Sequence, residues 1–293
     1  MIKLNIQTGT QKVSFSLGEV TYFYGPNYDL KFDIIQTLRK HFFNVDQSEY
    51  DYEKEQTSRI FINDEALNIK KWKYYELTPM FNLETEFKLG SKSLMIQYVE
   101  SNLVNIEYEE EVSSINILYQ TLNELMTEKL NIEDFEVEIE PKLIELSLKT
   151  IIKSLELKLL KEEHIASTHN LTYSEIMKFQ IFIAKSIAKN NPHKHYIFKV
   201  DLPKLNEDII KSLKDIENAH FIIVNEHDIL ETPRENVIYF GKEIINFSDD
   251  VLLYEKIMLE YGSITTLEDL NIIIKQFLTK EDNEITRILK ENL

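Results

Sequence analysis

The sequence predicts an α/β fold in which a mostly parallel sheet is flanked by helices and carries an inserted α-helical domain. Three observations lead to this prediction. An apolar run, a glycine turn and a lysine follow one another at residues 20–31. A helical stretch with almost no glycine fills residues 91–163, and strand and helix patterns alternate again from residue 171. Such alternation produces a parallel sheet covered by helices.

Length and composition limit the class of protein. The chain has 293 residues, of which 43% are hydrophobic, so it can bury a large core. It has no cysteine, which excludes disulfides and thiolate metal sites. The start of the chain lacks the layout of a signal peptide, and no apolar run approaches the ~20 residues of a membrane span. We expect a cytoplasmic protein without a membrane partner.

The net charge is strongly negative. Fifty acidic residues against 33 basic residues give −17. Taken alone, this charge argues against DNA as a partner, because non-specific DNA binding needs a basic surface. A local basic patch or channel in an acidic body remains compatible with it. The carboxylates, including the run at residues 107–111 and the pair Glu133 and Asp134, also favour Ca²⁺, which prefers oxygen ligands.

The first elements surround a loop that resembles a phosphate-binding loop. Residues 1–7 and 12–17 alternate apolar and polar side chains as half-buried strands do, and residues 20–24 form a buried strand. A helix is expected at residues 32–42. Short strands are expected at residues 59–62 and 73–77.

The loop itself matches the pattern G-x-x-x-x-G-K-[ST] only in part. Gly25 and Lys31 are in register, with Asn27 between them, but Leu30 replaces the second glycine and Phe32 replaces the hydroxyl residue that holds Mg²⁺. Lys31 is interpreted either as a phosphate or DNA contact or as a solvated lysine in the first turn of the helix.

The middle of the chain is predicted to be an inserted helical domain. Residues 91–126 form a helix with a break near Asn105, and a strand or extended link follows at residues 135–139. A second helix is expected from Pro141 to about Glu163. A two-helix arm and a compact bundle both fit. The core stripe of the first helix would contain Leu94, Tyr98, Leu103, Ile106, Ile115, Leu118, Leu122 and Leu125.

The α/β pattern returns in the last part. Thr172, with Glu175 in a capping box, begins a helix that reaches Asn190. Strands at residues 195–201, 220–224 and 236–240 and a helix at residues 206–216 follow. Three helices are expected at residues 249–261, 267–278 and 281–293. We therefore assign residues 1–88 and 166–248 to an α/β head, residues 89–165 to the inserted helical domain, and residues 249–293 to C-terminal helices.

The order of the later pieces resembles a P-loop head of the ABC-type ATPases. The helix from Thr172 resembles the signature helix, Asp201 ends a strand as a Walker B aspartate does, and His227 stands where those heads have a switch histidine. Residues 237–242 resemble the closing hairpin. Asp201 is interpreted either as a turn residue or as a metal ligand. His227 is interpreted as a structural or a catalytic residue.

Three departures from that pattern remove hydrolysis. The loop lacks its second glycine and its hydroxyl residue, Leu202 replaces the glutamate that polarises water, and Tyr173 and Ser174 replace the signature glycines. We expect no enzymatic activity and no bound nucleotide.

A narrower resemblance shows these losses together. Residues 15–21 and 29–31, with residues 252–261 near the other end, resemble the larger type of the CRISPR-associated Csn-two family, an adaptation protein of type II-A systems. The resemblance implies a degenerate ABC-type head and a homotetrameric ring around linear double-stranded DNA. It also implies Ca²⁺ in assembly, no catalysis, and partners in the CRISPR integrase complex and the effector nuclease.

Candidate DNA contacts are lysines that gather locally. For any single one of them, an ordinary solvated lysine is the favoured alternative. Lys70, Lys71 and Lys73 flank Trp72, while the others share helix faces in pairs or groups. These others are Lys149, Lys153, Lys178, Lys185 and Lys189.

Three hypotheses follow from the sequence. The first is a non-catalytic ring that binds double-stranded DNA ends in spacer acquisition. The second is a nucleotide-binding head of the ABC or chromosome-maintenance class. The third is a scaffold with a helical interaction arm and no affinity for nucleic acid.

Overall fold

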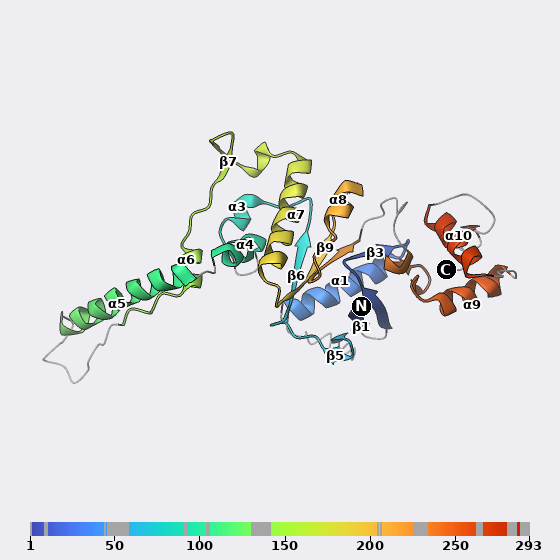
Figure 1. Cartoon of the computed structure of the whole chain (residues 1–293), viewed down its shortest axis with the longest axis horizontal. Coiled ribbons are helices and arrows are strands. Elements are labelled where there is room, and N and C mark those ends of the chain that lie inside the picture. The colour runs from blue at the N-terminus through green and yellow to red at the C-terminus, as the bar shows by residue number, and fades with distance from the viewer. Residues whose placement is uncertain are drawn as a thin grey trace. The chain divides into compact units, whose positions relative to one another are not determined.

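The chain divides into two compact units. In this computed structural model Met1–Phe81, Met177–Ile181 and Asn191–Leu293 form the first, here called the sheet unit, and Asn82–Ile176 and Phe182–Asn190 form the second, the helical unit. Figure 1 shows the elements of both. The described residues are 2–8, 11–43, 45, 59–90, 93–103, 106–129, 142–203, 205, 207–224, 234–261, 266–279 and 286–287.

A six-stranded sheet forms the centre of the sheet unit, in the order β12-β11-β3-β10-β9-β6. All neighbours pair in parallel except β11 and β12, which form an antiparallel hairpin. The predicted α/β class with a mostly parallel sheet is confirmed. Its strands consist mostly of buried residues, as strands of a parallel sheet with both faces covered do. They are β3 (Val20–Tyr24), β6 (Trp72–Leu77), β9 (His195–Val200), β10 (Ala219–Ile223), β11 (Val237–Phe240) and β12 (Ile244–Asn246).

A second, antiparallel sheet has the order β2-β1-β4-β5. Its strands are β1 (Ile2–Thr8), β2 (Gln11–Leu17), β4 (Arg59–Ile62) and β5 (Glu65–Ala66). In β2, Val13 and Phe15 are buried, whereas Lys12 and Ser14 are exposed. This alternation is the pattern that predicted half-buried strands here.

Helix α1 (Tyr28–Phe42) joins the two sheets through one core. Its Ile34 and Leu38 pack in a cluster that contains Leu4 of β1 and Phe240 of β11. The helix begins four residues before the predicted start at residue 32, because Asn27 caps it and Tyr28 to Lys31 already lie in its first turn.

The remaining helices of the sheet unit are short. Helix α8 (Glu207–Ser212) ends before the predicted residue 216, where Asp215 adopts a positive φ of 71°. Helices α9 (Asp250–Tyr261) and α10 (Leu267–Leu278) follow a 3₁₀ turn at Arg234–Asn236 and match the prediction within one residue. Phe277 of α10 packs edge-on against Tyr239 of β11. Of the predicted helix at residues 281–293, only residues 286–287 are described.

The helical unit contains α3 (Leu83–Glu86), α4 (Leu94–Leu103), α5 (Ile106–Lys129) and α6 (Leu148–Lys153). The predicted break near Asn105 lies outside the described residues, between the end of α4 and the start of α5. A hairpin of β7 (Leu159–Lys161) and β8 (His164–Ala166) and a 3₁₀ turn at Thr168–Asn170 follow. Helix α7 (Tyr173–Asn190) contributes residues to both units, and Thr172 and Glu175 form the predicted capping box.

The predicted long helix from Pro141 to Glu163 is wrong. Residues 142–147 are extended, α6 covers only six residues, and Glu162 and Glu163 have positive φ angles of 52° and 65° in the β7–β8 turn. Two asparagines of α5 hold the extended segment in place of a helix. The predicted strand at residues 135–139 lies outside the described residues.

The asparagine contacts have the geometry of a strand ladder. The Asn116 side chain donates to the carbonyl of Leu146 at 2.9 Å and accepts from its N–H at 2.8 Å. Asn123, two helical turns further along, makes the same pair of bonds with Leu143. The backbone N–H and carbonyl groups of Leu143 and Leu146 are thus hydrogen-bonded without forming a helix. Figure 1 shows this segment running beside α5.

The predicted core stripe is only partly correct for α4, where Leu94 is buried but Tyr98 and Leu103 are half-buried, and it is wrong for α5. Leu94 of α4 is 4% exposed, but Leu118 of α5 is 64% exposed. In the part of the chain that the structure describes, no helix is both long and apolar enough to cross a membrane.

Candidate nucleic-acid interface

Gly25 ends β3 in a conformation that requires glycine. Its φ is +111°, and a Cβ atom there would lie 2.8 Å from both the nitrogen and the carbonyl carbon of Phe240. Residues with a side chain rarely adopt such a positive φ, and a Cβ atom is not found so close to backbone atoms. The glycine that matches the phosphate-loop pattern therefore serves the contact between two neighbouring strands, β3 and β11.

The backbone N–H groups of this loop are used within the protein. The Asn27 N–H donates to the Phe240 carbonyl at 3.0 Å, and the Tyr28 N–H donates to the Pro26 carbonyl at 3.0 Å. The Leu30 N–H donates to the Asn27 side chain at 3.1 Å, and the Lys31 N–H donates to the Asn27 carbonyl at 3.3 Å. A phosphate cradle needs such groups free to point at the ligand. Here they close the turn on itself.

The side chain of Asn27 fixes the loop from a second direction. Its amide donates to the Gly241 carbonyl at 3.0 Å, while its oxygen caps α1. Asn27 is thus a positioning residue between the β11–β12 hairpin and the helix.

Lys31 does not point into solvent. It is 2% exposed, and its ammonium group lies 4.7 Å from the centre of the Tyr28 ring. A cation over an aromatic face is stabilised by the ring quadrupole. The interpretation of Lys31 as a solvated first-turn lysine is wrong, and its burial leaves the ammonium group little access to an external phosphate.

Asp201 follows β9 at the same edge of the sheet as the loop, but β10 lies between the two strands. Its carboxylate accepts from Lys199 at 3.2 Å, and its N–H donates to the Leu77 carbonyl. The neighbouring Leu202 is fully buried. Asp201 therefore has a local ion-pair partner. His227 lies outside the described residues.

Four lysines come together at the opposite edge of the same sheet. Lys70 and Lys71 precede β6, and Lys194 precedes β9. The Lys71 carbonyl accepts from the His195 N–H at 2.9 Å, so parallel pairing places the two strand starts side by side. We call Lys70, Lys71, Lys73 and Lys194 the amino-edge cluster. Sequence reasoning missed Lys194, because only strand pairing brings it to the others.

Two lysines of the cluster are exposed, and the other two, Lys73 and Lys194, are half-buried. Lys70 and Lys71 are exposed, and Lys73 donates to the Ile69 carbonyl at 3.0 Å. The loop of Lys194 is held by Asn218, whose amide donates to the Lys194 carbonyl at 2.8 Å. Next to Asn218, Glu217 supplies one exposed negative charge.

A row of stacked rings lies beside these lysines. The indole of Trp72 stacks on His195 at 4.5 Å between ring centres and on His220 at 5.6 Å. His220 donates from Nδ1 to the Gly18 carbonyl at 2.9 Å, and burial lowers its pKa to about 4. Burial also lowers the pKa of His195. Both rings are therefore neutral at pH 7, and they form a rigid, uncharged support for the strand starts.

The other predicted lysines are distributed over both units. Lys149 and Lys153 are exposed on α6, and Lys189 is exposed on α7, all in the helical unit. Lys185, also of the helical unit, is half-buried on α7. Lys178 is exposed on the part of α7 that belongs to the sheet unit. The amino-edge cluster is a group of lysines that strand pairing assembles within the sheet unit.

Among the described residues, no group of three or more acidic or histidine side chains could hold a metal ion. Glu109, Glu110 and Glu111 of α5 are exposed and solvated. Glu133 and Asp134 lie outside the described residues.

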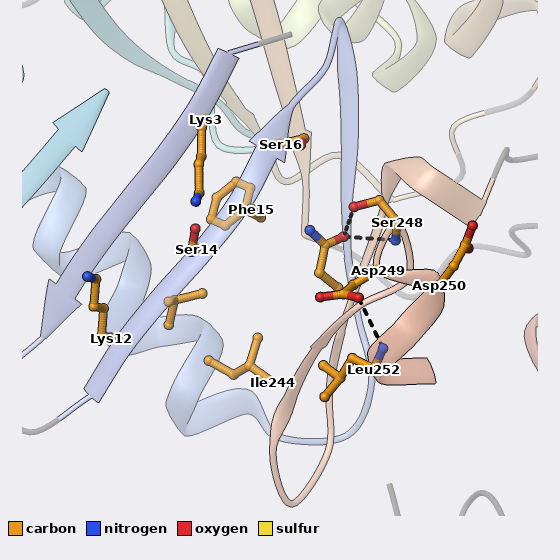
Figure 2. Close-up of a pocket in the computed structure, with 12 residues that line it drawn as sticks. Lys3, Lys12, Ser14, Phe15, Ser16, Ile244, Ser248, Asp249, Asp250 and Leu252 are labelled. Atoms are coloured by element: carbon orange, nitrogen blue, oxygen red, sulfur yellow. Dashed lines mark hydrogen bonds between the residues drawn. The ribbon is translucent and has the colours of Figure 1, made fainter. Parts of the chain in front are cut away.

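A pocket of about 670 Å³ lies between β2 and the start of α9 (Figure 2). Lys3 and Lys12 stand on one wall, and Asp249 and Asp250 on the other. The carboxylate of Asp250 pairs with Arg234, and that of Asp249 accepts from the Leu252 N–H. Both carboxylates therefore already have partners within the protein, at the start of α9. No sequence pattern predicts this pocket, since its walls come from segments that lie far apart in the chain.

Comparison with known proteins identifies the fold. No family model and no curated protein matches the chain. Among solved structures, Stu0660 of Streptococcus thermophilus matches with a TM-score of 0.69 and 15% sequence identity, over 99% of this chain and 93% of that one. At this identity the likeness shows a shared fold over nearly the full length of both chains.

Proposed function

We propose that this chain is a non-catalytic protein that binds double-stranded DNA, at its ends, during CRISPR spacer acquisition. The observation that carries the proposal is the amino-edge cluster, in which strand pairing gathers four lysines on an otherwise acidic protein. Phosphate contacts by lysine are independent of sequence, as capture of arbitrary DNA requires.

Two further observations support the family. Residues 15–21, 29–31 and 252–261 resemble the Csn-two proteins, and the fold is shared with Stu0660 of Streptococcus thermophilus over nearly the full length of both chains. We extend the resemblance to a degenerate ABC-type head, a homotetrameric ring, and the CRISPR integrase complex and effector nuclease as partners. In a closed ring, symmetry repeats the amino-edge cluster around one channel and adds the weak contacts together.

The proposal is tested with linear and covalently closed duplexes of the same sequence. Binding is measured by fluorescence anisotropy over a salt series, and the affinity for linear DNA should fall steeply as salt rises. Equal binding to closed circles would contradict threading over ends. Absence of binding near 0.1 M salt would contradict a DNA partner altogether.

A lysine variant with a matched control tests the surface itself. Changing Lys70, Lys71 and Lys194 to Gln should weaken DNA binding at least tenfold and reduce the salt slope, because about three phosphate contacts are lost. The control changes Lys12, Lys211 and Lys275 to Gln and has the same net charge. A loss of equal size in both variants would mean that overall charge, and not this cluster, governs binding.

The same proposal excludes nucleotide hydrolysis. The loop N–H groups of Asn27, Tyr28, Leu30 and Lys31 are bonded within the protein, and the Lys31 side chain is buried. Calorimetric titration with Mg²⁺-ATP should give no binding heat. Tight binding that disappears in Lys31→Ala would instead favour a nucleotide-binding head of the ABC or chromosome-maintenance class.

The proposal includes Ca²⁺ as an ion that promotes assembly by binding between copies of the chain. Size-exclusion chromatography with and without Ca²⁺ tests this role. A larger particle in Ca²⁺ that returns to the smaller size with chelator supports this role. An unchanged size in both conditions would remove Ca²⁺ from the proposal.

A further inference from the structure

The pocket of Figure 2 lies along the edge of a strand. Consecutive residues of β2, residues 12–16, line it. Successive side chains of a strand point to opposite faces, so a pocket on one face of the sheet would be lined by alternate residues only. Val13 and Phe15 belong to the core, at 3% and 1% exposure, yet both line this pocket. The pocket therefore borders the backbone edge of β2.

Strand β2 is the outermost strand of its sheet, so one of its edges has no neighbouring strand. The Asn63 N–H donates to the Lys3 carbonyl at 2.9 Å, so the backbone of Lys3 faces the side of β4. Backbone groups alternate between the two sides of a strand, so Leu4 faces β2, where it lies opposite Phe15. Ile6 and its partner in β2 bond in the same way.

The other residues of β2 point their backbone groups away from β1. By this alternation, Lys12, Ser14 and Ser16 direct their N–H and carbonyl groups to the open edge. In the described part of the chain, no group forms a hydrogen bond with them. An edge with such groups free is a template for pairing with another strand.

The opposite wall of the pocket carries a second open edge. Strand β12 is the outermost strand of the six-stranded sheet. The Phe247 N–H donates to the Val237 carbonyl at 3.0 Å, so Phe247 and Ile245 face β11. The alternate residues Ile244 and Asn246 direct their N–H groups away from β11, and both line the pocket. The pocket is thus a groove bordered by two strand edges.

We propose that this groove binds an extended peptide of another protein, which adds a strand to β2 and carries acidic side chains at alternate positions. The backbone chemistry favours a polypeptide, because a peptide strand both donates to carbonyl groups and accepts from N–H groups at the spacing of the edge. Phosphate groups only accept, so they would leave the carbonyls of β2 without donors. The inference does not depend on the proposed function.

The charges beside the edge predict which side chains the peptide carries. Lys3 shares one face of the sheet with Lys12, and both are exposed. In the described part of the chain, neither forms an ion pair. On the other wall, the carboxylates of Asp249 and Asp250 already have partners. The unpaired charge along β2 is therefore positive, although the whole chain carries −17.

Alternation along an added strand turns this charge into a sequence preference. Peptide side chains on the face of Lys3 and Lys12 are expected to be acidic, since opposite charges on neighbouring strands attract. The side chains between them point to the other face, toward the side of Val13 and Phe15, and are expected to be apolar. Residues 12–16 span about 17 Å, so about five peptide residues pair with the edge.

A synthetic peptide tests the proposal directly. A fluorescein-labelled peptide of about seven residues, alternating glutamate and valine, is titrated with the full chain and followed by fluorescence anisotropy. We expect saturable binding, and at least tenfold weaker binding of a peptide in which lysine replaces glutamate. Absence of binding to the wild type would overturn the proposal. Displacement of the peptide by inorganic phosphate at an equal concentration would also overturn it, because a small anion would then be the ligand.

A backbone variant tests strand addition. Ser14→Pro removes an N–H that faces the open edge and places a ring there, while the pairing of β2 with β1 does not use this N–H. Ser14→Ala is the matched control, because it changes the same side chain and keeps the N–H. Circular dichroism verifies the folding of both. The peptide affinity should fall at least tenfold in Ser14→Pro and less than about twofold in Ser14→Ala, and equal affinities would contradict pairing with the β2 backbone.

A charge variant keeps the proposal testable if Ser14→Pro does not fold. Lys3→Glu/Lys12→Glu should weaken peptide binding at least tenfold. Lys88→Glu/Lys275→Glu changes two other exposed lysines and has the same net charge. Losses of equal size in both variants would overturn the proposal, since overall charge would then govern binding.

Two further measurements separate this inference from DNA binding and from self-association. The DNA affinity of Lys3→Glu/Lys12→Glu should equal that of Lys88→Glu/Lys275→Glu, whether or not the proposed function holds. A selective loss of DNA affinity in the first variant would assign the edge to DNA and overturn the proposal. In sedimentation velocity, association of the wild type that disappears in Lys3→Glu/Lys12→Glu, without peptide binding, would assign the edge to a second copy and overturn it as well.

Discussion

The backbones of Gly25 and Phe240 meet so closely that no side chain fits at position 25. A Cβ atom there would lie 2.8 Å from the Phe240 nitrogen, and the φ of Gly25 is +111°. The strand end, the turn and the β11–β12 hairpin are consequently locked to one another.

Gly25→Ala should therefore lower the free energy of unfolding by about 2–4 kcal/mol, because strain at positive φ adds to the clash with the Phe240 backbone. Urea denaturation measures it. Gly90→Ala is the matched control, since a Cβ atom at Gly90 meets nothing within 4 Å. A loss below about 0.5 kcal/mol for Gly25→Ala would contradict the close approach.

Asn27→Ala should cost about 1–2 kcal/mol of stability. The change removes the cap of α1 and the bond from the side-chain amide to the Gly241 carbonyl. Asn27→Asp should recover part of the loss, because a carboxylate still accepts from the Leu30 N–H but has no amide for Gly241. Thermal unfolding of the three proteins ranks these contributions, and equal values for Ala and Asp would assign the whole effect to the Gly241 bond.

Stability should fall as pH decreases below about 6.5. The pKa of buried His220 is about 4 in the folded protein against 6.5 in the unfolded chain, so the unfolded state binds the proton more readily between these values. The contribution is complete above pH 6.5 and is lost toward pH 4, amounting to about 2 kcal/mol between pH 7 and 5. His220→Phe should flatten the profile in this window, and urea midpoints at pH 7 and 5 provide the comparison. An unchanged slope would contradict the assignment to His220.

Removing both asparagine ladders should release residues 142–147. In Asn116→Ala/Asn123→Ala, the N–H groups of Leu143 and Leu146 lose their acceptors, and their hydrogen exchange should accelerate at least tenfold. Gln120→Ala, also on α5, is the control and should leave these amides unchanged. Equal exchange in all proteins would mean that the side-chain amides do not hold the segment.

Much of the sheet was predictable from local pattern. The five-residue run of β3 and the alternation of β1 and β2 have the periods that strands require, and the capping box at Thr172 and Glu175 begins α7 as expected. The prediction of a long helix from Pro141 was wrong. The apolar residues there have helical spacing, but the segment is held by contacts that its own sequence does not contain. The asparagines that favour an extended chain lie about twenty to thirty residues earlier in the sequence.

The sequence by itself determined the α/β class and the partly matching loop around Gly25, with its departures at Leu30 and Phe32, because these depend on residue type and near neighbours. Tertiary structure decided the rest. Pairing of β6 with β9 brought Lys194 to Lys71, packing buried Lys31 beside Tyr28, and the extended residues 142–147 left the α5 stripe exposed. The periodicity of apolar residues in the sequence predicts which side chains share one face of a helix. Which surface covers that face depends on segments far away in the chain.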